Sequence, residues 1–155
     1  MPSRVIPILR LAVLCESIEL DKEGRPFFCV PVHTIQFPPG IKRNYQPPAL
    51  HAYLQLQEAL GTFNLKVLFR REKEEFDLFA SVPVPIEFDG QNHQNVPLEL
   101  DIELLGLVIP EPGCYEFWVV ANHVNLHSPD HQPGWSFPPM KLNVFGPDGT
   151  EGGVL

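Results

Sequence analysis

Apolar residues recur at every second position over much of this chain, which is the spacing of β-strands with one buried face. Successive side chains of a strand point to opposite sides, so this period argues against amphipathic helices over the same segments. Four segments alternate cleanly: 50–56, 63–69, 82–88 and 98–104. The first of them, extended to residue 60, is also compatible with a helix, because Leu50, Leu54 and Leu60 fit a period of 3.6 residues.

Four further segments favour strands, and together with the first four they predict seven or eight strands in all. They are 8–20 and 26–37, expected to form a hairpin, and 114–123 and 139–145. Short strands separated by turn residues favour an all-β fold, a single antiparallel two-sheet sandwich of Ig-like or Greek-key type, over a closed barrel. We expect one sandwich domain over residues 1–145 and a flexible glycine-rich tail over 146–155.

Prolines interrupt the alternation of apolar residues, and the chain has 18 of them among 155 residues. The chain is not a disordered proline-rich sequence, because 44% of its residues are hydrophobic and only 19% are charged. Pro83 and Pro85 stand two residues apart, so both lack the amide on the same side of their strand. This spacing predicts that the strand lies at a sheet edge or leaves one sheet there.

The charge of the chain is unevenly distributed. The net charge is −8, and no Lys or Arg occurs between Glu74 and Met140, where acidic residues are frequent. This surface excludes a nucleic-acid or anionic-membrane partner and favours a basic protein partner or a divalent cation. Glu99, Asp101 and Glu103 lie on one side of a predicted strand, about 7 Å apart. They are either the solvated outer face of that strand or a site for the basic partner.

Four potential metal ligands cluster in the connection 123–138: His123, His127, Asp130 and His131. The spacing of the histidines would align them on a helix and fit zinc or another divalent transition metal. Pro129 and Pro133 interrupt any such helix, so a polar exposed loop is the alternative.

The same connection carries two aromatic residues, Trp135 and Phe137, among turn-forming residues. They either fold back over the end of the sandwich or, if exposed, form a hot spot for a protein partner. We expect deletion of 124–137 to leave the fold intact.

Cys15, Cys29 and Cys114 lie within apolar segments and include no C-x-x-C pair, which predicts reduced thiols in a cytoplasmic protein. The apolar start of the chain is interrupted by Pro7 and Arg10 and is interpreted as a first strand. No apolar run is long enough for a membrane helix. No catalytic motif of a hydrolase, nucleotide-binding enzyme or metalloprotease occurs, so an enzymatic function is not supported.

Four segments are similar to a family of short, uncharacterised bacterial β-sandwich proteins: 12–24 (AVLCESIELDKEG), 35–38 (IQFP), 61–69 (GTFNLKVLF) and 110–117 (PEPGCYEF). The resemblance covers nearly the whole chain in order, through turn and core residues. It implies a β-sandwich and carries no activity or binding residues. The chain departs from the family at 123–138, where relatives have a tight hairpin. Tyr115 resembles the corner tyrosine of Greek-key sandwiches, whose hydroxyl ties a crossing loop.

Together these features predict a non-catalytic binding or assembly module without a cofactor, which presents its acidic surface and the 123–138 loop to a protein partner. One alternative is a metal-binding protein or metal-dependent enzyme that uses the loop histidines. Another is a homo-oligomeric structural subunit, which the mass in solution would reveal.

Overall fold

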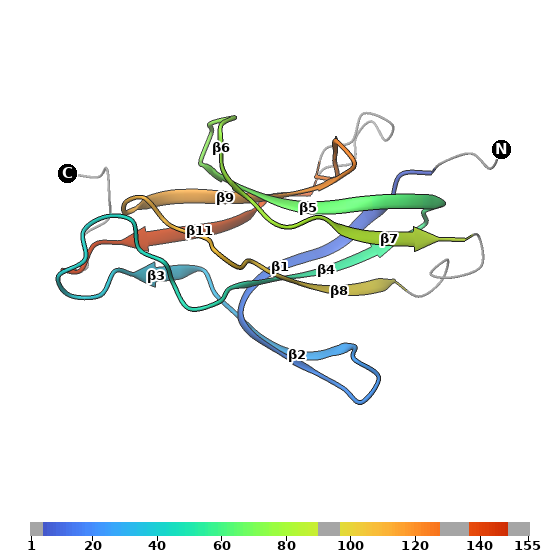
Figure 1. Cartoon of the computed structure of the whole chain (residues 1–155), viewed down its shortest axis with the longest axis horizontal. Coiled ribbons are helices and arrows are strands. Elements are labelled where there is room, and N and C mark those ends of the chain that lie inside the picture. Colours follow the sequence, from blue (N-terminus) through green and yellow to red (C-terminus); the bar gives the residue numbers. More distant parts are fainter. Residues whose placement is uncertain (1–4, 90–96, 128–136, 149–155) are drawn as a thin grey trace.

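The structure, a computed structural model, describes residues 5–89, 97–127 and 137–148 and arranges them in two β-sheets (Figure 1). The smaller sheet has the strand order β2 (Pro26–Pro31), β1 (Ile8–Leu20), β4 (His51–Gln57), β8 (Leu98–Glu103). The larger has the order β3 (Thr34–Gln36), β11 (Met140–Phe145), β9 (Gly113–Ala121), β5 (Gly61–Arg71), β6 (Asp77–Ala80), with β7 (Val84–Phe88) also on β5 and β10 (Val124–Asn125) on β9. Nothing within these described ranges forms a helix that could cross a membrane.

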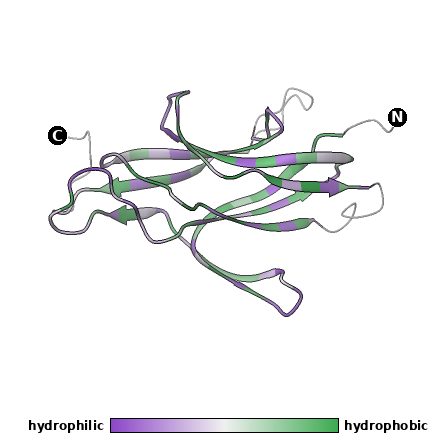
Figure 2. Cartoon of the chain, viewed as in Figure 1, coloured by the Kyte–Doolittle hydropathy of each residue, from purple (hydrophilic) through white to green (hydrophobic). Residues whose placement is uncertain are grey.

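One hydrophobic core lies between the two sheets. Its side chains come from alternate positions of strands in both sheets, and hydrophobic and hydrophilic residues alternate along the strands (Figure 2). Leu54 and Leu56 of β4 and Phe63 and Phe69 of β5 are fully buried. The predicted all-β fold with two sheets is therefore confirmed, and the segment 50–60 contains a strand and no helix.

The predicted number of strands and the purely antiparallel arrangement are wrong. The described residues form eleven strands, and β3 runs parallel to β11. The segment 26–37, expected to be one strand, divides at Val32–His33, where the chain leaves β2 in one sheet and enters β3 in the other. Because this crossing is set by packing between layers, the alternation within the segment carries no information about it.

The prolines at 83 and 85 lie at a sheet edge, as predicted. β7 pairs with β5 alone among the described strands. Just before β7 the alternation fails, because Val82 was expected to face inward and is 76% exposed. Ser81 causes this break: its amide donates to the carbonyl of Val67, and its hydroxyl accepts from the amide of Val67, so the chain bends between β6 and β7.

Tyr115 is buried, and its hydroxyl donates to the carbonyl oxygen of Glu111, which is the corner contact that the sequence suggested. Of the predicted flexible tail, only residues 146–148 lie within the described part of the chain. Pro147 is held there, since its carbonyl accepts a hydrogen bond from the side chain of Gln36 at 3.1 Å.

Candidate binding site

The outer face of the smaller sheet carries two facing rows of polar side chains. Strands β4 and β8 pair in antiparallel register, with His51 opposite Glu103, Tyr53 opposite Asp101 and Gln55 opposite Glu99. Their neighbours Ala52 and Leu54 face the core. The alternation that buries one side of each strand therefore gathers the polar side chains on the other.

Hydrogen bonds join the two rows diagonally across the register. The Tyr53 hydroxyl donates to Glu99 Oε1 at 3.0 Å, and the Gln55 amide donates to the Tyr53 oxygen at 2.8 Å and to Glu99 at 3.4 Å. His51 Nδ1 lies 2.8 Å from Asp101 Oδ1. Burial, the largest cause, raises the pKa of Tyr53 above its ordinary value.

The three acidic residues predicted as a site therefore differ from one another. Glu99 and Asp101 are half-buried and hydrogen-bonded, whereas Glu103 is exposed. The first two are part of an ordered polar face and are not a uniformly solvated ladder. Their partners on β4 hold each carboxylate in one orientation, which prepares it for a ligand.

A projecting hairpin lies beside this face. Strand β1 pairs with β4 as far as Cys15, opposite His51, and from Cys15 onward it pairs with β2. We call residues 16–30 the arm. It leaves the layered body of the protein and projects from it (Figure 1, blue).

The turn at the tip of the arm is fixed by one side chain. Asp21 Oδ1 accepts hydrogen bonds from the amides of Glu23 and Arg25, at 3.0 and 2.8 Å. These bonds, led by that from Arg25, lower the pKa of Asp21. Gly24 takes a left-handed backbone conformation with φ of 79°, which a tight turn of this kind requires.

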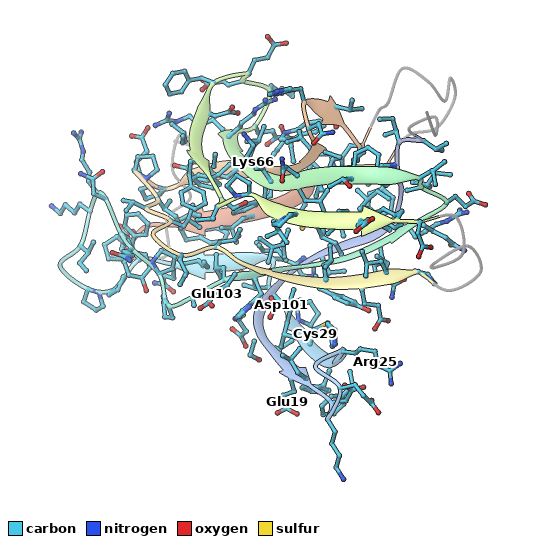
Figure 3. The ribbon with its side chains drawn as sticks, turned by 45° about the vertical axis from the view of Figure 1, so that its right-hand side comes forward. Glu19, Arg25, Cys29, Lys66, Asp101 and Glu103 are labelled. Carbon is cyan, nitrogen blue, oxygen red and sulfur yellow. The ribbon has the colours of Figure 1, made fainter. Side chains whose placement is uncertain are left out.

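A cleft of about 190 Å³ lies between the arm and the polar face. We call it the arm cleft, and its lining residues are Pro26, Phe27, Phe28, Cys29, Tyr53 and Glu99. Figure 3 shows Cys29 of the arm and Asp101 of β8 at the angle between the arm and the sheet. Phe27 and Phe28 are 64% and 53% exposed, so two aromatic side chains stand at the entrance beside a carboxylate.

His127, predicted as a metal ligand in an exposed loop, is buried, with 1% of its surface exposed. Its Nε2 accepts a hydrogen bond from the Val119 amide at 2.9 Å. Its Nδ1 lies 3.1 and 3.2 Å from the carbonyl oxygens of Phe137 and Pro138 and therefore carries the proton. Burial lowers the pKa of His127, which keeps the ring neutral. Both ring nitrogens serve the backbone, so this geometry leaves neither for a metal ion.

The remaining predicted ligands are not brought together by the structure. His123 is exposed and lines a shallow polar groove with Lys66 and Asn122, whereas Asp130 and His131 lie outside the described residues. Among residues 5–89, 97–127 and 137–148, no group of three or more His, Cys, Asp or Glu side chains is placed to hold a metal ion.

Phe137 is half-buried against the core, with its ring centroid 6.0 Å from that of His127. It thus matches the expectation of an aromatic folded back onto the sandwich, whereas Trp135 lies outside the described residues. The Phe137 amide donates to the His127 carbonyl at 2.8 Å, and Leu126 is buried. Deletion of 124–137 would remove these core contacts, so we now expect it to destabilise the fold and not to leave it intact.

The hairpin expected between 8–20 and 26–37 is present as β1 and β2, and its outer part is the arm. Sequence reasoning missed the cleft beside the arm and the role of β4. His51, Tyr53 and Gln55 were recognised only as the outward positions of a strand. The available signal was that two strands, 51–57 and 98–103, both present hydrogen-bonding side chains on their outer sides. Their pairing was not visible, because more than forty residues separate them in the sequence.

Comparison with protein-family models and with curated proteins gives no match to this chain. The site is therefore interpreted from its own geometry.

Proposed function

We propose that this protein is a non-catalytic binding module that holds a basic segment of a protein partner in the arm cleft. The observation that carries this proposal is the position of Glu99. Its carboxylate is fixed by Tyr53 and Gln55 in the floor of a cleft whose entrance carries two exposed phenylalanines.

The charge of the cleft favours a cationic side chain. Glu99 accepts its hydrogen bonds from neutral donors, so these contacts leave its negative charge uncompensated. The other described residues that line the cleft are apolar or neutral, and no Lys or Arg occurs between residues 74 and 140. A Lys or Arg that enters the cleft would form a charge-assisted hydrogen bond that is shielded from solvent on one side.

The aromatic entrance favours the same ligand. The aliphatic stem of a Lys or Arg side chain packs on a phenylalanine ring while its cationic end reaches the carboxylate. A cation above the face of such a ring gains about 0.5–1 kcal/mol at an exposed site. Phe27 and Phe28 thus supply contact area, and Glu99 supplies charge.

The test starts from a random peptide library selected on the intact protein, followed by calorimetry of the selected peptides. We expect the selected peptides to be enriched in Lys or Arg, and their affinity to fall as salt is added. Phe28→Ala and Glu99→Gln should each weaken binding about tenfold, the usual effect of removing one central contact. Replacement of the peptide lysine by norleucine should weaken binding to the same extent as Glu99→Gln.

Glu75→Gln and Phe76→Ala are the matched controls, because both residues are exposed and lie in the connection between β5 and β6, in the other sheet. They should leave the affinity unchanged. Selection of acidic or neutral peptides, or equal losses in the control variants, would show that the arm cleft is not a site for basic segments.

We also propose that the two-sheet fold is a sandwich of the Ig-like or Greek-key type. The chain moves repeatedly between the layers, from β2 to β3, from β4 to β5 and from β7 to β8. The buried Tyr115, bonded to Glu111, supports this assignment, since a corner tyrosine accompanies such crossings. An experimental structure with a different connection of the two sheets would overturn it.

A further inference from the structure

Two cysteines meet at the base of the arm. Cys15 pairs with Pro31 in the register of β1 and β2, and Cys29, two residues before Pro31, lies on the same side of β2. Burial, followed by a hydrogen bond with the Cys29 side chain, raises the pKa of Cys15 to about 12. The strand register thus places both cysteines on the same side of neighbouring strands, diagonally across the pairing.

The two thiols differ in their access to solvent. Cys15 is fully buried, whereas Cys29 is half-buried and lines the arm cleft. A small molecule in the cleft therefore meets Cys29 before it meets the buried Cys15. Thiol–disulfide exchange needs such a pair: an accessible thiol attacks the small disulfide, and a second thiol then displaces the small molecule from the first.

A histidine–aspartate pair lies beside the buried thiol. His51 is opposite Cys15 in the register of β1 and β4, which places their Cβ atoms about 4.5–5.5 Å apart. Asp101 lies 2.8 Å from His51 Nδ1 and favours the proton on that nitrogen. Nε2 of His51 is then the proton acceptor of the ring.

We propose that Cys15 and Cys29 form a dithiol site that exchanges with small disulfides of the glutathione class, in addition to any binding of a partner. The Cys29 thiolate attacks one sulfur of oxidised glutathione, which forms a mixed disulfide and releases one glutathione thiolate. Cys15 then gives its proton to His51 and attacks the Cys29 sulfur. The second glutathione thiolate leaves and takes up a proton, so two protein thiols are oxidised and one glutathione disulfide is reduced to two thiols.

Cys114 provides an internal contrast. It is half-buried like Cys29, but it lies on β9 in the other sheet, opposite Asn143 of β11. It has no cysteine beside it among the described strands. Oxidised glutathione should therefore give at most a mixed disulfide at this position.

The experiment exposes the reduced, folded protein to oxidised glutathione, quenches it with acid and maps the cysteines by peptide mass spectrometry. The wild-type protein should lose the mass of two hydrogen atoms and yield a linked Cys15–Cys29 peptide. Cys15→Ala should stop at the glutathione adduct of Cys29, and Cys114→Ser should behave like the wild type. No partner protein is present, so the result is independent of the proposed function.

A wild-type protein that gives only glutathione adducts, with no internal link while its circular dichroism stays native, would overturn the proposal. This outcome needs no variant, so a folding defect in Cys15→Ala does not affect it. His51→Gln tests the proton step: it should slow the conversion of adduct to internal disulfide by about a hundredfold, the lower end of general-base effects, and leave the final ratio of the two forms unchanged. An unchanged rate would remove His51 from the step.

Discussion

Phe69→Ala is expected to lower the free energy of unfolding by about 3–5 kcal/mol, the usual cost of removing a large aromatic side chain from a core. Phe69 is fully buried near the C-terminal end of β5. Its ring stacks on Tyr115 and contacts Phe117, each with a centroid distance of 4.8 Å. The substitution thus leaves a cavity beside two aromatic rings, and urea denaturation followed by fluorescence measures the loss.

Phe76→Ala is the control for this prediction. Phe76 is 71% exposed, so its removal should change the free energy of unfolding by less than about 0.5 kcal/mol. Equal losses in the two variants would mean that the core does not lie between β5 and the opposite sheet as described.

His127→Leu is expected to cost about 3 kcal/mol at neutral pH, because it leaves a buried amide and two partly buried carbonyl groups of the backbone without this partner. The Val119 amide loses its acceptor, and the carbonyls of Phe137 and Pro138 lose their donor. Leucine fills a similar volume, so the loss reports hydrogen bonding more than packing. Thermal or urea unfolding at neutral pH measures it.

The same histidine makes stability depend on pH. Burial lowers the pKa of His127 below its ordinary value of 6.5, so the unfolded chain takes up a proton before the folded one. The free energy of unfolding should therefore be highest above that value and decrease as the pH falls below it, until the lowered pKa of the folded state is reached. Unfolding curves across this range should show the decrease in the wild type and a smaller one in His127→Leu.

His33→Gln is the matched control, since His33 is exposed. It should retain the full pH dependence. If His33→Gln and His127→Leu change the pH dependence equally, the buried position of His127 is wrong.

The alternation of side chains was sufficient to predict most of the strands. It located β5 to within two residues at each end and β8 to within one, because each has one fully apolar side and no interruption. It failed at Val82, where the hydrogen bonds of Ser81 bend the chain, and at Val32, where the chain changes sheets. Both failures come from contacts with distant strands, which alternation within one segment does not report.

The parallel pairing of β3 with β11 was unpredictable for a related reason. The two strands are separated by about a hundred residues, and Thr34–Gln36 is too short to carry a pattern. Parallel strands need a long connection between them, so no turn motif fixes their direction.

The candidate site was only partly accessible from sequence. The acidic row at 99–103 followed from charge and alternation, but its partners on β4 required the pairing of two distant strands. His127 was misread because its neighbours resemble loop residues. Its burial depends on three backbone groups, from Val119, Phe137 and Pro138, that no side-chain motif reveals.

The change of partner along β1 divides this strand between two cooperative units. Residues 8–14 pair with β4 inside the body of the protein, so we expect those of their amides that bond to β4 to exchange with solvent only when the whole domain opens. Residues 17–20 pair with β2, so we expect the arm to open and reclose more readily than the core. One continuous strand thus joins the body of the protein to the arm, and Cys15 lies at the boundary between them.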